Sequence, residues 1–143
     1  MAFNQYPKIT LRHKDTYEYV STNETGNSVE IDMYDANEKK HQSPTELLLS
    51  AVASCTAVDV VEILQKRRKE FTDFTIEAKG DRQADHPRYF KKITLTISMK
   101  SANVTASEVE KHAKLIIEKY CSVATTVSGM CELEVIANIE PEN

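Results

Sequence analysis

The feature of this sequence that most constrains the fold is a long stretch with almost no charge, residues 43–69. Between Leu47 and Leu64, its charged side chains are those of Asp59 and Glu62. A helix that is apolar around its whole circumference has to be covered on every side. The stretch therefore predicts one long buried helix, around which the rest of the chain is wrapped.

Both ends of this helix carry recognisable signals. Ser43 is a favourable N-cap, Pro44 suits the first helical position, and Glu46 completes a capping box with Ser43. A basic run at residues 66–69 complements the negative end of the helix dipole. These signals place the start and the end of the predicted helix.

Composition limits the class of protein. A length of 143 residues suggests a single domain, residues 1–143. One small domain rarely hides a helix that is apolar on all sides, so we expect a homo-oligomer. The net charge of −4 provides no basic surface, and no nucleic-acid partner is expected. The stretch is long enough to span a membrane, but its two carboxylates and its serine and threonine residues favour a core helix, and no membrane partner is expected.

Cysteine and histidine usage points to a reducing compartment. The N-terminus lacks a basic region followed by an apolar run, so no secretion signal is expected. The three cysteines form no C-x-x-C pair, which is typical of a cytoplasmic protein. The four histidines have no metal-ligand spacing, and no nucleotide or phosphate motif is present. We therefore expect neither a metal nor a cofactor.

The remaining sequence alternates between strand and helix patterns. Alternating apolar residues, separated by turns such as Lys14-Asp15 and 23–27, predict strands, and a capping box from Thr105 to Glu108 opens a second helix. This order predicts an α+β fold with antiparallel strands packed on helices. The expected strands are residues 7–13, 16–22, 28–34, 72–79, 89–99 and 130–139; further helices are expected at 105–120 and 123–128, the latter stopped by Gly129, and a polar connecting loop at 35–42.

The three cysteines differ in their local surroundings. Cys55 lies near the middle of the long helix, far from its N-cap and one turn before Asp59, so local sequence favours a buried packing role over a reactive thiolate. Cys121 lies between two predicted helices, just before the Ser122 cap, where amides of the next helix could approach its sulfur. Both a functional and a structural role remain open for Cys121. Cys131 lies in the inward-facing set of the last strand, which indicates packing.

Charged side chains offer further candidates for a site. Glu46 could serve in acid–base chemistry or charge relay, although its place in the capping box explains it structurally. Arg12 on the first strand and Arg82 and Arg88 in the loop after residue 79 could activate a thiol, although such residues are more often surface charges. The sequence alone leaves these alternatives open.

Three stretches together resemble one family. These are SPTELLLSAVASCTAVDVVEIL around Cys55, EKYCSVA around Cys121, and the strand HPRYFKKITLTISM between them. They resemble the cysteine motifs of the osmotically inducible protein C and organic hydroperoxide resistance family (OsmC/Ohr), and the third is similar to its YhfA-like branch. The resemblance covers nearly the whole chain.

The resemblance implies a fold and a reaction. It implies an OsmC-like α+β fold in which antiparallel sheets wrap a long central helix, in an intertwined homodimer with its sites at the subunit interface. It also implies a thiol-dependent peroxidase acting on organic hydroperoxides. Cys55 would be oxidised to a sulfenic acid, and Cys121 would close a Cys55–Cys121 disulfide that an external thiol reduces.

Two positions depart from the pattern of the active members of that family. Thr45 stands where those members carry a glutamate, and Glu46 is rotated by about 100° from that position. The N-terminal strands also lack the family arginine, for which Arg12 or Arg88 would have to substitute. The alternative prediction is therefore a stress-associated or small-ligand-binding protein, for an apolar or thiol ligand, that keeps the cysteines without the peroxidase reaction.

Overall fold

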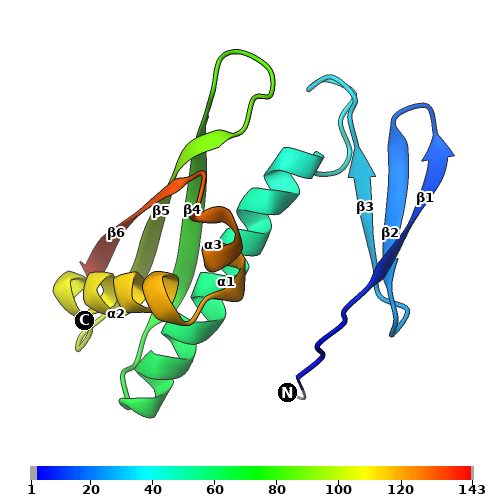
Figure 1. Ribbon diagram of the computed structural model, residues 1–143. Helices are drawn as coiled ribbons and strands as arrows, with labels where there is room; N and C mark the ends of the chain where they lie inside the picture. The colour runs from blue at the N-terminus through cyan, green and yellow to red at the C-terminus, as the bar shows by residue number, and fades with distance from the viewer. Residues whose placement is uncertain (1–2, 143) are drawn as a thin grey trace. The chain divides into compact units, whose positions relative to one another are not determined.

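The computed structural model describes residues 3–142 and divides the chain into two compact units, Met1–Leu48 and Leu49–Asn143 (Figure 1). In the described residues the elements follow the predicted order, with shifted boundaries. They are β1 (Ile9–Asp15), β2 (Glu18–Asn23), β3 (Ser28–Asp32), α1 (Pro44–Lys66), β4 (Thr72–Arg82), β5 (Phe90–Ser101), α2 (Ala106–Lys119), α3 (Ser122–Val127) and β6 (Glu132–Pro141).

The first unit contains an antiparallel sheet in the order β1-β2-β3. The turn predicted at Lys14-Asp15 was placed too early, because β1 continues to Asp15 past an irregularity in its pairing with β2. The Asp15 carboxylate then accepts a 2.7 Å hydrogen bond from the amide of Thr16, which starts the turn. The second turn uses Gly26 at a φ of 83°, a conformation that favours glycine.

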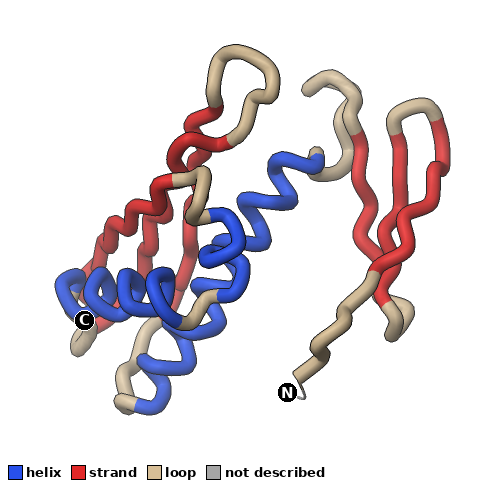
Figure 2. The backbone as a smooth tube through the Cα atoms, viewed as in Figure 1, coloured by secondary structure: helices blue, strands red, loops and turns tan. Residues whose placement is uncertain are grey.

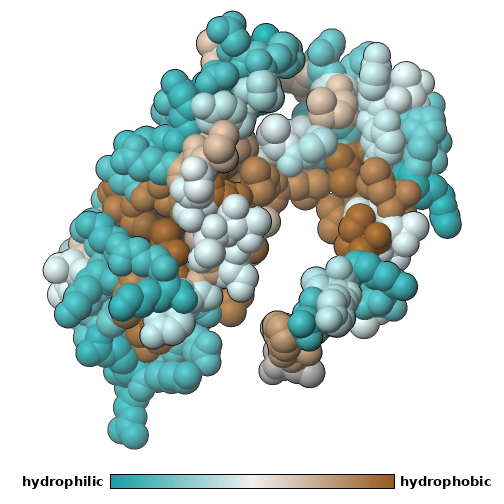
Figure 3. Space-filling model, viewed as in Figure 1, coloured by the Kyte–Doolittle hydropathy of each residue, from teal (hydrophilic) through white to brown (hydrophobic). Residues whose placement is uncertain are grey.

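The two faces of this first sheet differ in polarity. Residues directly opposite one another in the ladder share a face, and the rows Leu11–Ser21–Val29 and His13–Tyr19–Ile31 give one face its apolar character. Leu11 is 53% exposed and Val29 is 49% exposed. Figure 3 shows apolar surface over these strands. A sheet with one apolar face normally buries that face against another element.

A buried carboxylate anchors the loop between β3 and α1. Asp32 has no exposed surface, and its carboxylate accepts hydrogen bonds from the amides of Lys40 and His41, both at 2.8 Å, and from Lys39 Nζ at 3.0 Å. Burial raises the pKa of Asp32, but these three donors outweigh it and hold the pKa at about 2. The loop that the sequence analysis treated as a polar connection is therefore fixed to the end of β3.

Helix α1 starts as predicted and ends earlier. Ser43 and Glu46 form the predicted capping box, in which the Glu46 carboxylate accepts from the Ser43 amide at 3.0 Å and the Glu46 amide donates to Ser43 Oγ at 3.3 Å. The prediction that the helix extends to Lys69 was wrong, because Arg68 has a φ of 57°. The amide of Lys69 then bonds to the Leu64 carbonyl at 2.9 Å, as in a Schellman motif.

Within the second unit α1 is covered along one stripe. Its buried residues, Val52, Thr56, Val60 and Leu64, recur every four positions, whereas Val58 is 61% exposed. With a mean hydropathy of 2.0, α1 also has the length and composition of a membrane-spanning helix, which the core helices of soluble proteins share.

The second unit contains a mixed sheet in the order β4-β5-β6. The β4–β5 pair is antiparallel, but β6 runs parallel to β5, with Ile93 opposite Leu133 and Ile97 opposite Ala137. The prediction of antiparallel strands was therefore wrong for β6. The chain between β5 and β6 contains α2 and α3, which provide the long crossover that a parallel pair requires.

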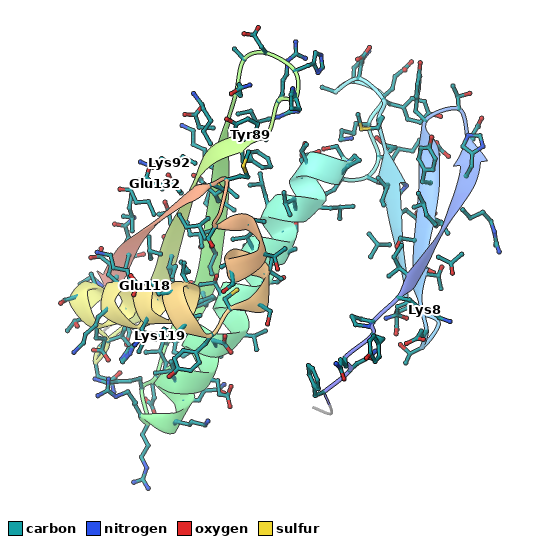
Figure 4. The ribbon with its side chains drawn as sticks, viewed as in Figure 1. Lys8, Tyr89, Lys92, Glu118, Lys119 and Glu132 are labelled. Atoms are coloured by element: carbon teal, nitrogen blue, oxygen red, sulfur yellow. The ribbon has the colours of Figure 1, made fainter. Side chains whose placement is uncertain are left out.

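Helices α1, α2 and α3 contribute to one core on this sheet (Figure 2). The inward-facing residues of β6 are those predicted, with Val135 and Ala137 buried, and Cys131 is buried directly before the strand. On β5, alternate residues face the same core; they are Ile93, Leu95, Ile97 and Met99. The opposite side of the sheet is polar and carries an ion pair from Lys92, labelled in Figure 4, to Glu134 at 2.7 Å.

One glycine is required by a close contact in this sheet. Gly80 lies in β4 opposite Ile93, and a β-carbon added at Gly80 would clash with the ring of Phe90. Phe90 is 8% exposed and belongs to the core, so its ring has little freedom to move. The loop predicted from Gly80 is instead the end of β4.

We predict that Gly80→Ala destabilises the protein by about 1–3 kcal/mol, because the extra methyl group overpacks the ring of Phe90. The free energy of unfolding from urea titration measures the effect. Gly129→Ala is the matched control, because nothing lies within 4 Å of a β-carbon there, and it should change stability by less than about 0.5 kcal/mol. Equal effects of the two changes would contradict the assigned contact.

We also predict that the acid sensitivity of the protein depends on Asp32. Its pKa is lowered from 3.8 to about 2, so its contribution to stability is complete above the higher value. That contribution is lost as the pH falls from about 4 toward 2. In thermal unfolding between pH 5 and pH 2, wild-type stability should fall more steeply than that of Asp32→Asn, with Asp35→Asn in the same loop as control. Parallel curves for wild type and Asp32→Asn would contradict this role.

Candidate functional site

The structure brings together two of the predicted site residues, Cys55 and Cys121. Their side chains form a hydrogen bond in the core of the second unit. Cys121 has no exposed surface, and Cys55 is half-buried. Because the two residues are 66 positions apart in the chain, only the tertiary fold makes them neighbours.

Helix α1 places Cys55 at the edge of its buried stripe. Cys55 directly precedes Thr56, which is fully buried and donates its hydroxyl to the Val52 carbonyl at 2.9 Å. The hydroxyl of Thr56 is thereby satisfied within the helix. The neighbouring position leaves Cys55 half-buried, packed against the core.

The chain reversal between α2 and α3 places Cys121. The amide of Cys121 donates to the Ile116 carbonyl at 2.7 Å and closes the end of α2. Cys121 then acts as the N-cap of α3, and its sulfur accepts hydrogen bonds from the amides of Ala124, at 3.3 Å, and Val123. The prediction that amides of the following helix approach this sulfur is confirmed.

The electrostatic surroundings favour the protonated form of Cys121. Burial raises the pKa of its thiol, and the hydrogen bond with Cys55 raises it further, while the amides of Ala124 and Val123 oppose this shift. The Cys121 thiol is therefore held protonated, in a setting that excludes water from its sulfur.

The third cysteine belongs to a different part of the core. Cys131 is 6% exposed, packs in a cluster with Ile93 and Phe90, and donates its S–H to the carbonyl of Glu132 at 3.5 Å. Burial also raises the pKa of the Cys131 thiol. Cys131 borders a hollow of about 340 Å³ at the surface of the second unit.

The predicted carboxylate Glu46 acts at the start of α1. Its carboxylate accepts from the amide and the hydroxyl of Ser43, and these two hydrogen bonds lower its pKa. Lys39 Nζ lies 3.8 Å from the same carboxylate and 3.0 Å from Asp32. Sequence reasoning missed Asp32 and Lys39, because one acidic residue at the end of a strand and one lysine in a polar loop carry no spacing signal.

The predicted arginines are engaged elsewhere or lie on the surface. Arg88 Nε donates to the Ala84 carbonyl at 2.9 Å, and Arg82 Nε donates to the Arg88 carbonyl at 2.8 Å, so both stabilise the loop between β4 and β5. Arg12 lies opposite Val20 in the β1–β2 ladder and is exposed. The contacts of Arg82 and Arg88 are those of structural residues.

Comparison with known proteins adds a family and a set of solved folds. The model of the family described as OsmC-like protein matches residues 37–136. Protein YhfA of Escherichia coli is 38% identical over 85 residues, which is 59% of this chain and 63% of that relative. The chain therefore matches less than two thirds of the length of this curated relative.

Solved structures are similar over nearly the full chain. A hypothetical protein from Aquifex aeolicus is 28% identical with a TM-score of 0.83, covering 98% of this chain and 100% of that chain. An OsmC-like protein from Mycoplasma pneumoniae is 16% identical with a TM-score of 0.79, covering 96% and 99%. The organic hydroperoxide resistance protein OhrB of Bacillus subtilis is 18% identical with a TM-score of 0.64, covering 93% and 98%. At these identities the last two establish the fold alone.

Proposed function

The chain belongs to the OsmC-like protein family, and from this premise we propose that it is a thiol-dependent peroxidase that reduces organic hydroperoxides with Cys55 and Cys121. The observation that carries the proposal is the hydrogen bond between these two thiols, one half-buried and one fully buried. Solved relatives of the same fold are named organic hydroperoxide resistance proteins.

The proposed reaction has two steps on the protein. The Cys55 thiolate attacks a peroxide oxygen, the O–O bond breaks, and the alcohol leaves after taking up a proton, which leaves a sulfenic acid on Cys55. The sulfur of Cys121 then attacks the Cys55 sulfur. The S–O bond breaks, the Cys121 proton leaves with the hydroxide as water, and a Cys55–Cys121 disulfide forms. An external thiol reductant returns both residues to thiols.

The surroundings of the two thiols support an organic substrate. The core cluster around them consists of apolar side chains, among them Val60, Ile117 and Val123. An apolar wall stabilises the hydrocarbon part of an alkyl or aryl hydroperoxide by about 25 cal/mol per Å² of buried surface. Hydrogen peroxide has no such part, so we propose a preference for organic hydroperoxides.

We further propose that the protein is a cytoplasmic homodimer. Support comes from two apolar surfaces, each left uncovered within its own unit: the Leu11–Val29 face of the first sheet, and the side of α1 that carries Val58. A second copy presents the same surfaces and satisfies both with an isologous interface. Three free thiols in the described residues suit a reducing cytoplasm.

A second candidate function is the binding of a small apolar or thiol ligand without turnover. The observation that favours it concerns the recorded contacts of Cys121. Among the described residues, these contacts are backbone amides, Cys55 and apolar side chains, and none of them is a cation. A thiolate is activated by a nearby positive charge. Fast alkylation of Cys55 below neutral pH would count against this second function.

We predict that Cys55→Ser reduces turnover of cumene hydroperoxide, measured with excess dithiothreitol, to the uncatalysed rate, because the attacking sulfur is gone. Cys121→Ser should complete the first step and stall, with a sulfenic acid on Cys55 that dimedone traps and mass spectrometry detects. Cys131→Ser is the matched control and should retain turnover, since it removes a thiol of similar burial outside the pair. Turnover that survives in Cys55→Ser would refute the peroxidase.

We predict that Leu11→Lys weakens the homodimer by about tenfold or more. Burying a leucine side chain contributes about 1.5–3 kcal/mol, and 1.4 kcal/mol corresponds to tenfold in affinity. Sedimentation equilibrium over a range of concentrations measures the dissociation constant. Thr10→Lys, on the opposite face of β1, is the control and should leave it unchanged. Sedimentation of the wild-type protein as a monomer at about 50 µM would contradict the dimer.

A further inference from the structure

Helix α3 has little intrinsic stability. It has six residues, Ser122–Val127, and four of them are β-branched, which lowers helix propensity. Thr126 Oγ1 donates to the Ser122 carbonyl at 2.7 Å, and Ser128 Oγ donates to the Thr125 carbonyl at 3.0 Å, hydrogen bonds that weaken or bend a helix. Ala124 is the buried residue of α3, and Val123 and Val127 pack against the core while only partly buried.

The N-cap therefore contributes an unusually large share of the stability of α3. The first amides of a helix have no partner within the helix. In α3 the amides at its second and third positions, Val123 and Ala124, both donate to Cys121 Sγ. This cap is not the usual side-chain oxygen but a sulfur that also forms a hydrogen bond with Cys55.

The same sulfur changes its bonding during the proposed reaction. A covalent bond to Cys55 requires the two sulfurs to come closer than a hydrogen bond brings them, so the Cys121 sulfur is drawn toward α1. This displacement of the sulfur weakens the hydrogen bonds from Val123 and Ala124.

We propose that α3 is a redox-controlled lid, which the Cys121 cap holds closed in the reduced protein and which formation of the Cys55–Cys121 disulfide releases. This inference rests on the proposed function, because it needs the Cys55–Cys121 bond. It gives the disulfide a structural effect beyond the two residues that it joins. It also identifies the moving part as the segment 122–128.

Release of α3 opens a route to the buried half of the disulfide. Cys55 is half-buried, but Cys121 has no exposed surface, so a thiol that attacks the Cys121 sulfur needs an opening in the core. The hollow of about 340 Å³ borders α3 at Thr125, continues to the C-terminal end of α2 at Glu118, labelled in Figure 4, and has Cys131 in its wall. When α3 loosens, this hollow extends toward Cys121.

The reduction then runs from the hollow. The incoming thiolate attacks Cys121 Sγ, the S–S bond breaks, and Cys55 leaves with the electron pair as a thiolate. A second thiol attacks the mixed disulfide on Cys121 and releases it as a thiol, while the external reductant becomes a disulfide. The restored Cys121 sulfur caps α3 again, and the lid closes over it.

Cys131 provides an internal reporter for this motion. Its amide donates to the carbonyl of Val127, the last residue of α3, at 3.1 Å, and Cys131 lines the hollow with Thr125 and Ser128. In the closed lid Cys131 is 6% exposed. Opening of α3 should therefore expose a thiol that takes no part in the proposed reaction.

The test compares hydrogen exchange of residues 122–128 in reduced and disulfide-bonded full-length protein. Diamide forms the disulfide by taking two electrons and two protons from the thiols, so the measurement is independent of peroxide chemistry. Loss of an N-cap corresponds to about fivefold in the closing equilibrium, so exchange in 122–128 should be about fivefold faster after oxidation. Residues 106–116 of α2 should be unchanged, and Cys131 should react faster with N-ethylmaleimide.

Two substitutions test the cap without any disulfide. Cys121→Ala removes the cap atom and should give the fast exchange in the untreated protein, whereas Cys121→Ser retains a capping hydroxyl and should keep the slow exchange, with or without peroxide. The two variants remove the same thiol, so a loss of packing common to both cannot explain a difference between them.

The outcomes separate the lid from the peroxidase. Equal exchange in 122–128 before and after the Cys55–Cys121 bridge forms would overturn the lid, as would equal exchange in Cys121→Ala and Cys121→Ser. If neither diamide nor cumene hydroperoxide produces the bridge, the lid is also overturned. If diamide forms the bridge and opens α3 while cumene hydroperoxide does nothing, the peroxidase fails and the redox-controlled lid stands.

Discussion

Incomplete burial of one apolar helix governs the structure of this protein. Helix α1 buries the stripe from Val52 to Leu64 within the second unit, and this contact builds the core with β5, α2 and β6. The stripe also fixes the position of Cys55, which adjoins the buried Thr56. The apolar residues on the rest of the helix circumference, such as Val58, are exposed within the second unit.

The core buries the two sulfurs of the site to different extents, and the chemistry of the site depends on this difference. Burial disfavours ionisation, and complete burial of Cys121 keeps it protonated beside the half-buried Cys55. Amides of α3 at Cys121 oppose this effect by favouring negative charge on the sulfur. The sulfur of Cys121 therefore has a structural task as a helix cap and a proposed chemical task as a resolving thiol. Because one atom serves both tasks, a change in its redox state affects the local fold.

In the first unit, a buried carboxylate fixes the loop that leads into α1. Asp32 is fully buried, and its cost of desolvation is offset by two backbone amides and the Lys39 ammonium. Lys39 also lies within 3.8 Å of Glu46 in the capping box. The carboxylate of Glu46, a candidate for catalysis from the sequence, thus belongs to a network that fixes a loop and starts a helix.

The sequence by itself determined the order of the elements, the capped start of α1, the inward residues of β6 and the approach of amides to Cys121, because capping boxes and residue periodicity are local signals. It also carried the family motifs around Cys55 and Cys121. Only the tertiary structure decided that β6 pairs parallel to β5, that Arg68 ends α1 early, and that Cys55 and Cys121 share a hydrogen bond. Those features depend on residues distant in sequence or on a single backbone conformation, for which local sequence carries no pattern.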